Sequence, residues 1–277
     1  MMVKWLFLIF ICLFNHFYAQ VTPIYNDPLN AIKTEQPYLI QAMEMIRFGD
    51  AAGAVRLLRQ DANPAKQTFE SDFLIGYSYK QQGDIENAID FFSKATRYEA
   101  LSLPAFFERG NCYLTRKNFG QAVFDYNRVI LIDSTFIPAY NNRAYARIRN
   151  YGEIGMPVQQ LKFARLDMET ALRLSTQKGE GNRFEYYYNI GLIDLFLSEY
   201  KLAKLDFDAA INANPNVPKA YYYRGAAQFL SKAYHDAATD FKKAEEGGFV
   251  TNSSPEFLHI IDLIKQHEAL TGERISK

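Results

Sequence analysis

The feature that most constrains the fold is a spacing of about 34 residues that recurs along most of the chain. One series of small residues is separated by 34, 34, 47 and 34 positions: Gly76, Gly110, Ala144, Gly191 and Gly225. A second series is separated by 34, 34, 42, 39 and 34 positions: Ala54, Ala88, Ala122, Ala164, Ala203 and Ala237. The second series exceeds the period of 34 by 8 positions at one step and by 5 at the next. Two insertions of these lengths also account for the spacing of 47 in the first series. A recurring period of this length is typical of an array of repeated units.

Each unit has the pattern of two helices joined by a tight turn. Four residues after each alanine of the second series stands a large apolar residue: Leu58, Phe92, Tyr126, Met168, Phe207 and Phe241. Residues three or four apart share one face of a helix, so this spacing predicts a helix. Before that helix, Gly83 is suited to end the preceding helix and Asp84 to cap the next one. We therefore predict a pair of antiparallel helices in each unit.

The repeated segments resemble the tetratricopeptide repeat family. Segments 106–110, 139–144 and 220–225 resemble its first helix, and segments 122–126 and 237–241 resemble its second helix. The resemblance covers six units within residues 35–249, which start near Glu35, Phe69, Leu103, Ile137, Phe184 and Pro218. It implies an all-α fold, a right-handed α-solenoid of stacked helix pairs. Because one pair cannot bury its own apolar face, each unit is expected to depend on its neighbours.

Residues 1–19 have the pattern of a secretory signal peptide. Lys4 is their only charged residue, an apolar run follows in residues 5–14, and Ala19 is a small residue suited to cleavage before Gln20. The apolar run is shorter than the ~20 residues that a membrane-spanning helix needs. We therefore expect an exported protein of the bacterial periplasm or outer-membrane periphery, without a stable membrane span after cleavage. Retention of the segment as a membrane anchor is the alternative.

Other segments also depart from the repeat. Residues 20–34 contain prolines and lack clear periodicity, which predicts an extended leader. Residues 250–277 predict a capping helix, whose apolar face consists of Phe257, Leu258, Ile261 and Ile264. One insertion lies at residues 150–162, where residues 151–156 precede a long helix expected from about Pro157 to Leu174. The other lies at residues 175–181, where we expect a loop. Each insertion is either a partner contact or a tolerated surface feature.

Charge and motif content exclude several classes of function. Lys and Arg number 31, as do Asp and Glu, so the chain lacks the basic excess that nucleic-acid binding requires. The sequence contains no phosphate-binding loop, nucleophile elbow or zinc-protease motif. Cys112 lies in an apolar helical context, which favours a packed side chain over a nucleophile. The histidines lack the spacing of metal ligands. We predict no enzymatic activity, no cofactor and no metal site.

Two series of charged residues recur in phase with the repeat: Arg109, Arg143 and Arg224, and Asp125, Asp167, Asp206 and Asp240. A guanidinium and a carboxylate at fixed places on adjacent helices form charge-assisted pairs. We therefore predict structural ion pairs that fix the register of the helices. An anion-binding site lined by the arginines is the alternative.

The resemblance implies that partners bind in a concave groove formed by the first helices. Projected onto this chain, the groove residues are Phe73, Tyr77, Phe107, Asn111, Asn141, Asn142, Tyr145, Tyr188, Asn189, Lys219 and Tyr222. Asn side chains hydrogen-bond a peptide backbone, and aromatic side chains bury area on binding. Asn111 and Asn142 match the family's clamp for a terminal carboxylate, but Phe107, Glu185 and Asn189 replace its cations. The alternative for each aromatic residue is that it packs in the core between units instead of lining the groove.

These patterns together favour an exported, non-enzymatic scaffold that binds a protein or peptide through the groove, within a cell-envelope complex. The alternative is a periplasmic binding protein for a glycan or another small polymer, with Tyr145, Tyr188 and Tyr222 stacking on sugar rings. A regulatory subunit of an enzyme is a third hypothesis, which the sequence does not separate from the first.

Overall fold

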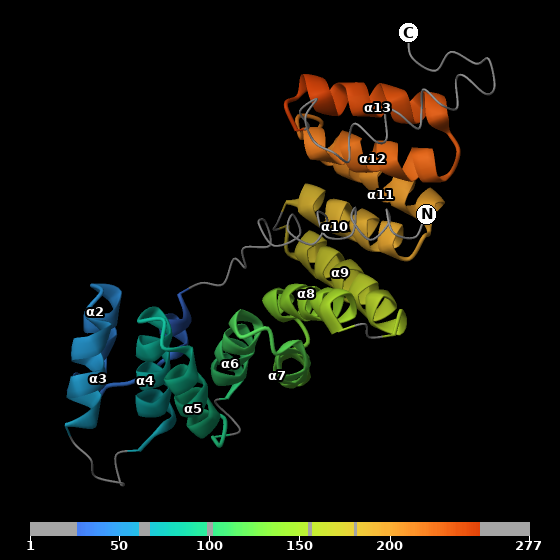
Figure 1. Ribbon diagram of the computed structural model, residues 1–277. Coiled ribbons are helices and arrows are strands. Elements are labelled where there is room, and N and C mark those ends of the chain that lie inside the picture. The colour runs from blue at the N-terminus through green and yellow to red at the C-terminus, as the bar shows by residue number, and fades with distance from the viewer. Residues whose placement is uncertain (1–26, 61–66, 99–101, 155–156, 180–181, 250–277) are drawn as a thin grey trace. The chain divides into compact units, whose positions relative to one another are not determined.

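The computed structural model describes residues 27–60, 67–98, 102–154, 157–179 and 182–249. All regular secondary structure in these residues is helical (Figure 1), and successive helices pair and stack, so the predicted all-α repeat fold is confirmed. None of the helices in these ranges has the length and apolar character needed to span a membrane. The predicted signal peptide, residues 1–19, and the predicted capping helix, residues 250–277, lie outside the described residues.

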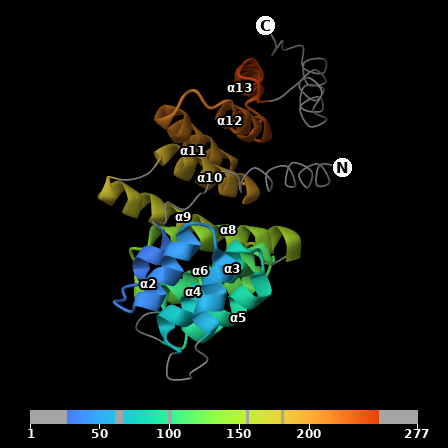
Figure 2. The same ribbon diagram turned by 90° about the vertical axis from the view of Figure 1, so that its left-hand side faces the viewer.

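The chain divides into an N-terminal unit, Pro23–Asn150, and a C-terminal unit that contains Tyr151–Lys277. The N-terminal unit consists of a short 3-10 helix followed by consecutive α-helices (Figure 2). These elements are η1 (Pro28–Ala31), α2 (Pro37–Arg47), α3 (Ala51–Arg59), α4 (Phe69–Gln81), α5 (Ile85–Ala95), α6 (Leu103–Thr115), α7 (Phe119–Ile132) and α8 (Ile137–Ile154), the last of which continues past the division. Each helix from α2 to α6 packs against the next one, and α4 also contacts α2 and α6.

The C-terminal unit repeats this arrangement. Its helices are α9 (Gln159–Lys178), α10 (Arg183–Phe196), α11 (Tyr200–Ala213), α12 (Pro218–Leu230) and α13 (Tyr234–Glu246). Each packs against the next, and α10 also contacts α12. We call the even-numbered helices α2 to α12 the first helices and the odd-numbered helices α3 to α13 the second helices. Contacts between successive first helices place their side chains on a shared surface in each unit.

A tight turn joins the two helices of a pair, as predicted at Gly83 and Asp84. Gly83 has a φ of 78°, a conformation that a residue without a Cβ adopts freely, and Asp84 accepts a hydrogen bond from the backbone N–H of Asn87 at 3.2 Å. Residues at the equivalent position of other pairs share the positive φ: Gly49, Lys117, Ser198 and Lys232. The turn is therefore set by its place in the repeat, and glycine occupies it only in some copies.

A glycine on the first helix meets an aromatic ring on the second helix. A Cβ added to Gly110 would lie 2.8 Å from Cε1 of Tyr126, which is fully buried. The same close approach pairs other glycines with the ring 16 positions later: Gly76 with Phe92, Gly191 with Phe207, and Gly225 with Phe241. The rings fill the space that the absent side chains leave, so the helices of a pair pack closely.

The core of the N-terminal unit includes part of the segment expected to be an extended leader. Within residues 27–34, Pro28–Ala31 form the 3-10 helix, and Leu29 and Ile32 are buried in the core. Asp27 accepts hydrogen bonds from the backbone N–H of Leu29 and from Nε of Arg47. These residues are therefore folded onto the unit rather than extended, because burial of their two apolar side chains favours packing.

The insertions lengthen helices. α8 contains 18 residues and α9 contains 20, whereas α10 to α13 contain 13 or 14. Residues 175–178, expected to belong to a loop, continue α9, which ends where Gly179 has a φ of 67°. Leu174 and Ser175 are both buried, so the core-facing side of the helix extends past the expected end. The expectation of a loop at residues 175–178 is therefore wrong, and residues 180–181 lie outside the described ranges.

The close approach at Gly110 predicts the effect of adding one methyl group. Gly110→Ala places a Cβ against the buried Tyr126 ring, and overpacking of this kind destabilises by about 1–3 kcal/mol. The control is Gly120→Ala in α7, where an added Cβ meets nothing within 4 Å. The control should gain about 0.5–1 kcal/mol because glycine is a poor helix former. Urea unfolding measures both changes, and a loss of stability in both variants would contradict the packing argument.

Candidate interaction surface on the first helices

Three aromatic residues expected to line a groove lie inside the helix pairs instead. The exposed fraction is 0% for Phe73 and 1% for both Phe107 and Tyr188. Their ring centroids lie close to rings on the second helix of the same pair: Phe73 and Phe92 at 5.5 Å, Phe107 and Tyr126 at 5.8 Å, and Tyr188 and Phe207 at 5.9 Å. These rings are core residues that a partner does not reach, because they fill the space beside the glycines.

The tyrosines expected to stack on sugar rings are also buried. Tyr145 and Tyr222, like Tyr188, are buried, and Tyr222 packs against the rings of Tyr223, Phe241 and Phe249. A sugar stacks on an open ring face, and these tyrosines do not form an exposed aromatic surface. The geometry therefore offers no support for the glycan alternative.

A strip of polar side chains connects successive first helices of the N-terminal unit. Lys80 on α4 forms an ion pair with Glu108 on α6. Asn111, also on α6, donates to Oε2 of Glu108 at 3.4 Å and accepts from Nδ2 of Asn142 on α8 at 2.9 Å. The hydroxyl of Tyr126 donates to the same Asn111 oxygen at 2.8 Å. We call Lys80, Glu108, Asn111 and Asn142 the polar strip.

The ion pair of the polar strip neutralises a carboxylate that is buried. The side chain of Glu108 is 2% exposed and that of Lys80 is 33% exposed. Burial lowers the pKa of Lys80, but the charge of Glu108 and its hydrogen bond outweigh this effect and raise the pKa overall. Sequence reasoning identified Asn111 and Asn142 but missed Lys80 and Glu108. The sequence contains a signal for Glu108, because this carboxylate directly follows Phe106 and Phe107 in an apolar stretch, and a buried carboxylate needs a partner.

The remaining predicted residues of the N-terminal unit lie around the polar strip. Tyr77 is half-buried, and Nζ of Lys80 lies 5.6 Å from its ring centroid. Asn141 is buried, and its Oδ1 has no hydrogen-bond partner. The first helices therefore combine satisfied polar contacts with at least one acceptor that the chain leaves unused.

A second polar contact joins first helices of the C-terminal unit. Nζ of Lys219 on α12 lies 3.7 Å from Oε2 of Glu185 on α10, and 4.2 Å from the ring centroid of Tyr188. Burial lowers the pKa of Lys219, and Glu185 opposes this shift. Asn189 is buried nearby in sequence on α10. Polar atoms buried without a hydrogen-bond partner in this unit include Oε2 of Glu185, the Tyr188 hydroxyl and Oε1 of Gln228, all on first helices.

The Cys112 thiol is packed in the core and is not poised for chemistry. The residue is fully buried, and burial raises the pKa of its thiol to about 12. A thiol with this pKa is protonated near neutral pH, whereas a nucleophilic cysteine needs its thiolate.

Arg109 ties three helices together. Its Nε and Nη2 donate to the two carboxylate oxygens of Asp125 on α7 at 2.9 and 2.7 Å. Its Nη1 donates to the hydroxyls of Ser93 and Thr96, at the end of α5, at 3.0 and 3.3 Å. Burial raises the pKa of Asp125, and Arg109 opposes this shift. The guanidinium is thus fully engaged by protein oxygens, which argues against the alternative of an anion site.

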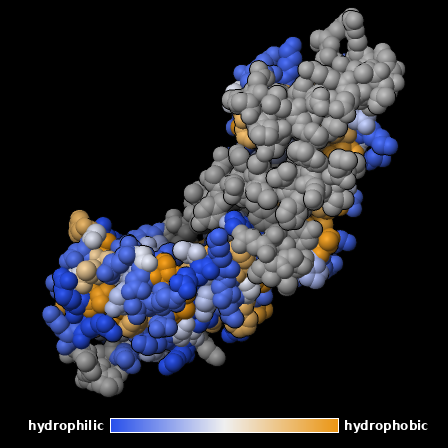
Figure 3. All heavy atoms as spheres, viewed as in Figure 1, coloured by the Kyte–Doolittle hydropathy of each residue, from blue (hydrophilic) through white to orange (hydrophobic). Residues whose placement is uncertain are grey.

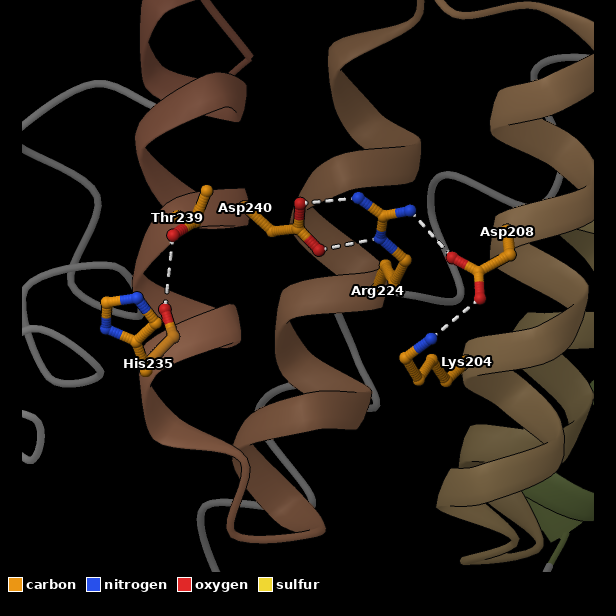
Figure 4. Close-up of polar contacts among 6 residues, drawn as sticks. All are labelled: Lys204, Asp208, Arg224, His235, Thr239 and Asp240. Atoms are coloured by element: carbon orange, nitrogen blue, oxygen red, sulfur yellow. Dashed lines mark hydrogen bonds and ion pairs between the residues drawn. The ribbon is translucent and has the colours of Figure 1, made fainter. Parts of the chain in front are cut away.

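Arg224 has the same arrangement in the C-terminal unit (Figure 4). It donates to both oxygens of Asp240 on α13 at 2.7 Å and to Asp208 on α11 at 2.7 Å. Lys204 also donates to Asp208 at 2.7 Å. The partners of Arg224 lie 16 positions before and 16 positions after it, as Ser93 and Asp125 do for Arg109. The hydrogen bond to Asp240 raises the pKa of Arg224.

Among the other predicted ion-pair residues, Arg143 shares part of this arrangement, whereas Asp206 departs from it. Arg143 donates to Oδ1 of Asn127, again 16 positions earlier, at 2.6 Å. Asp167 is buried on α9. Asp206 on α11 lies 4.0 Å from Nη2 of Arg165. The arginine position that would face Asp206 from α10, 16 positions before it, is occupied by Ile190.

The second helices carry exposed apolar side chains that sequence reasoning did not single out. They are Phe124, Leu131 and Ile132 on α7, Phe163 and Leu166 on α9, and Leu202 and Leu205 on α11. On the face shown in Figure 3, hydrophilic residues cover most of the N-terminal unit, with separate apolar residues between them. The second helices are thus a rival contact surface, which an experiment on partner binding must include.

The Arg109 contacts predict a loss of stability when the guanidinium is removed. Arg109→Leu leaves the fully buried Asp125 carboxylate without its cation, and the expected loss is about 3 kcal/mol. Arg173→Leu, at an exposed position on α9, is the control and should change stability by less than about 0.5 kcal/mol. Urea unfolding measures both. An unchanged free energy of unfolding in Arg109→Leu would show that the pair is not structural.

The polar strip predicts non-additive effects in a double-mutant cycle. Lys80→Met leaves Glu108 buried without its cation and should destabilise by about 2 kcal/mol or more. Adding Glu108→Leu removes the uncompensated charge and should recover most of that loss. The cycle is measured by chemical unfolding of both single variants and the double variant. Strictly additive changes would mean that Lys80 and Glu108 do not interact.

Comparison with known proteins identifies the family of the repeats in two segments of the chain. Residues 73–100 and 188–249 each match models of the tetratricopeptide repeat. Human tetratricopeptide repeat protein 6 is 25% identical over 193 residues, which cover 58% of this chain and 35% of that protein. Human tetratricopeptide repeat protein 13 is 25% identical over 178 residues, which cover 62% of this chain and 19% of that protein. The chain thus spans about a third or less of these relatives.

Solved structures share the fold at low sequence identity. The C-terminal part of a TPR repeat-containing protein from Cytophaga hutchinsonii has a TM-score of 0.62 and 14% identity, over 84% of this chain and 86% of that one. YrrB, described as a TPR protein with an unusual peptide-binding site, has a TM-score of 0.61 and 15% identity, over 75% of this chain and 99% of that one. The chain therefore contains tetratricopeptide repeats and has the α-solenoid fold of stacked helix pairs.

Proposed function

We propose that this chain is an exported, non-enzymatic scaffold whose first helices bind an extended peptide or a helix of a partner protein within a cell-envelope complex. The observation that carries the proposal is the polar strip, which crosses α4, α6 and α8 of the stacked helix pairs. Amide and charged groups that span successive helices suit the hydrogen-bonding groups of a peptide.

The surface proposed here is smaller than the groove expected from sequence. Phe73, Phe107 and Tyr188 belong to the core, so they support the first helices without touching a partner. Tyr77, Lys80 and Asn111 are partly exposed and provide the contact residues of the N-terminal unit. In the C-terminal unit, Glu185 on α10 is partly exposed and is the corresponding contact residue, while the buried Lys219 on α12 pairs with it.

Site-specific photo-crosslinking in the native cells tests this proposal. A photo-reactive phenylalanine analogue at Tyr77 samples the first helices, and the same analogue at Phe124, which is 56% exposed on α7, samples the second helices. We expect one discrete protein adduct from Tyr77 and none from Phe124. The mass of the isolated chain should correspond to a start at Gln20, because export removes the signal peptide.

Other outcomes contradict separate parts of the proposal. An adduct from Phe124 alone would place the partner on the second helices, where Leu131 also is exposed. Absence of a protein adduct at both positions would refute the scaffold function. A full-length mass would refute cleavage and leave the binding surface unaffected.

A further inference from the structure

One guanidinium faces three carboxyl groups where α9, α10 and α11 meet in the C-terminal unit. Nε of Arg165 on α9 donates to Oδ1 of Asp194 on α10 at 2.6 Å, and its Nη1 pairs with Glu169. Its Nη2 lies 4.0 Å from Oδ2 of Asp206 on α11, beyond hydrogen-bond distance. The cluster therefore contains more negative groups than its single cation can neutralise.

The repeat explains why a cation is missing. The aspartates equivalent to Asp206 in two other pairs, Asp125 and Asp240, each bind an arginine 16 positions earlier. The residue 16 positions before Asp206 is Ile190, whose side chain carries no charge. Asp206 therefore keeps its place beside α10 without the partner that this place normally provides.

Asp194 on α10 also has an unsatisfied carboxylate oxygen. It is fully buried, and its Oδ2 has no hydrogen-bond donor, although such an atom normally needs one. The carboxyl groups of Asp194 and Asp206 lie around the same Arg165 guanidinium, at 2.6 and 4.0 Å, and interaction with Asp194 raises the pKa of Asp206. Two ionised carboxylates are both acceptors, so Asp206 donates to the unused oxygen of Asp194 only when it carries a proton.

Other charged groups around α11 are engaged elsewhere. Lys204, on the same helix, donates to Asp208. Arg224 on α12 contacts α11 through Asp208 and otherwise binds Asp240. In the described part of the C-terminal unit, the groups that act on Asp206 are thus Arg165 and Glu169 from α9 and Asp194 from α10.

We propose that the protonated carboxyl of Asp206 donates a hydrogen bond to Asp194, and that this hydrogen bond is a pH-sensitive link between α10 and α11. The protonated carboxyl donates to the other one and satisfies the buried acceptor. Loss of the proton places two like charges together in a partly buried site, which loosens the contact between the helices. The C-terminal unit is thereby stabilised on acidification and weakened on alkalinisation.

The electrostatics give the direction of the pH dependence. Burial, the hydrogen bond with Asp194 and its charge raise the pKa of Asp206 from 3.8 to about 7, while Arg165 opposes this shift. Between these two values the folded chain holds a proton that the unfolded chain has lost. The stabilisation is therefore complete below about pH 4 and is lost as the pH rises through about 7.

The variant Asp206→Asn in the full chain tests the link. Its side-chain amide donates to Asp194 at every pH, as the protonated carboxyl does only below about pH 7. One proton changes the unfolding equilibrium constant about tenfold per pH unit. The stability of the variant relative to the natural chain should therefore rise roughly fiftyfold between about pH 5 and about pH 7, because Asp206 is only half deprotonated at the upper value. Urea unfolding across this range measures the difference.

A control and a spectroscopic readout separate the link from general charge effects. Glu199→Gln removes an exposed carboxylate just before α11, and its pH profile should run parallel to that of the natural chain. Carbon-13 NMR of the natural chain should show an aspartate carboxyl that titrates near pH 7. Parallel profiles for Asp206→Asn and the natural chain, or no aspartate signal titrating between about pH 6 and about pH 8, would overturn the proposal.

Discussion

The structure depends on the contact between a glycine of the first helix and the ring that lies 16 positions later on the second helix. Without a Cβ at Gly110, the ring of Tyr126 lies directly against the backbone of α6. The neighbouring positions, Arg109 and Asp125, have the same separation, so the same register brings guanidinium and carboxylate together. The apolar and ionic contacts of a pair are thus consequences of one helix alignment, and each one supports the other.

This coupling also explains the effect of a single departure from the repeat. Gly191 and Phe207 keep the close contact between α10 and α11, so Asp206 stays at its usual place although Ile190 replaces the arginine. Arg165 comes from the preceding second helix and is already bound to Asp194. The repeated packing therefore holds a carboxyl in a site whose charge is not balanced, which makes protonation the available way to satisfy it.

The distinction between core and surface bears directly on function. Buried aromatic residues of the first helices pack in the core, while the polar strip connects these helices at the edge of that core. A surface built on packed helices is held in one geometry before a partner arrives, which lowers the ordering cost of binding. Most exposed large apolar residues of the helices lie instead on the second helices, with Ile40 on α2 as an exception, so the two sides of a helix pair differ in the chemistry that they present.

The sequence alone determined the period, the helix pairs and the pairing of Arg109 with Asp125 and of Arg224 with Asp240, because these features follow from spacing along the chain. Tertiary structure decided which aromatic side chains are buried, since a pattern that puts Phe107 on one helix face does not say what covers that face. It also decided the contacts of Lys80 with Glu108 and of Arg165 with Asp194. These partners lie 28 and 29 positions apart, outside the register of a helix pair, so only the packing of neighbouring pairs brings them together.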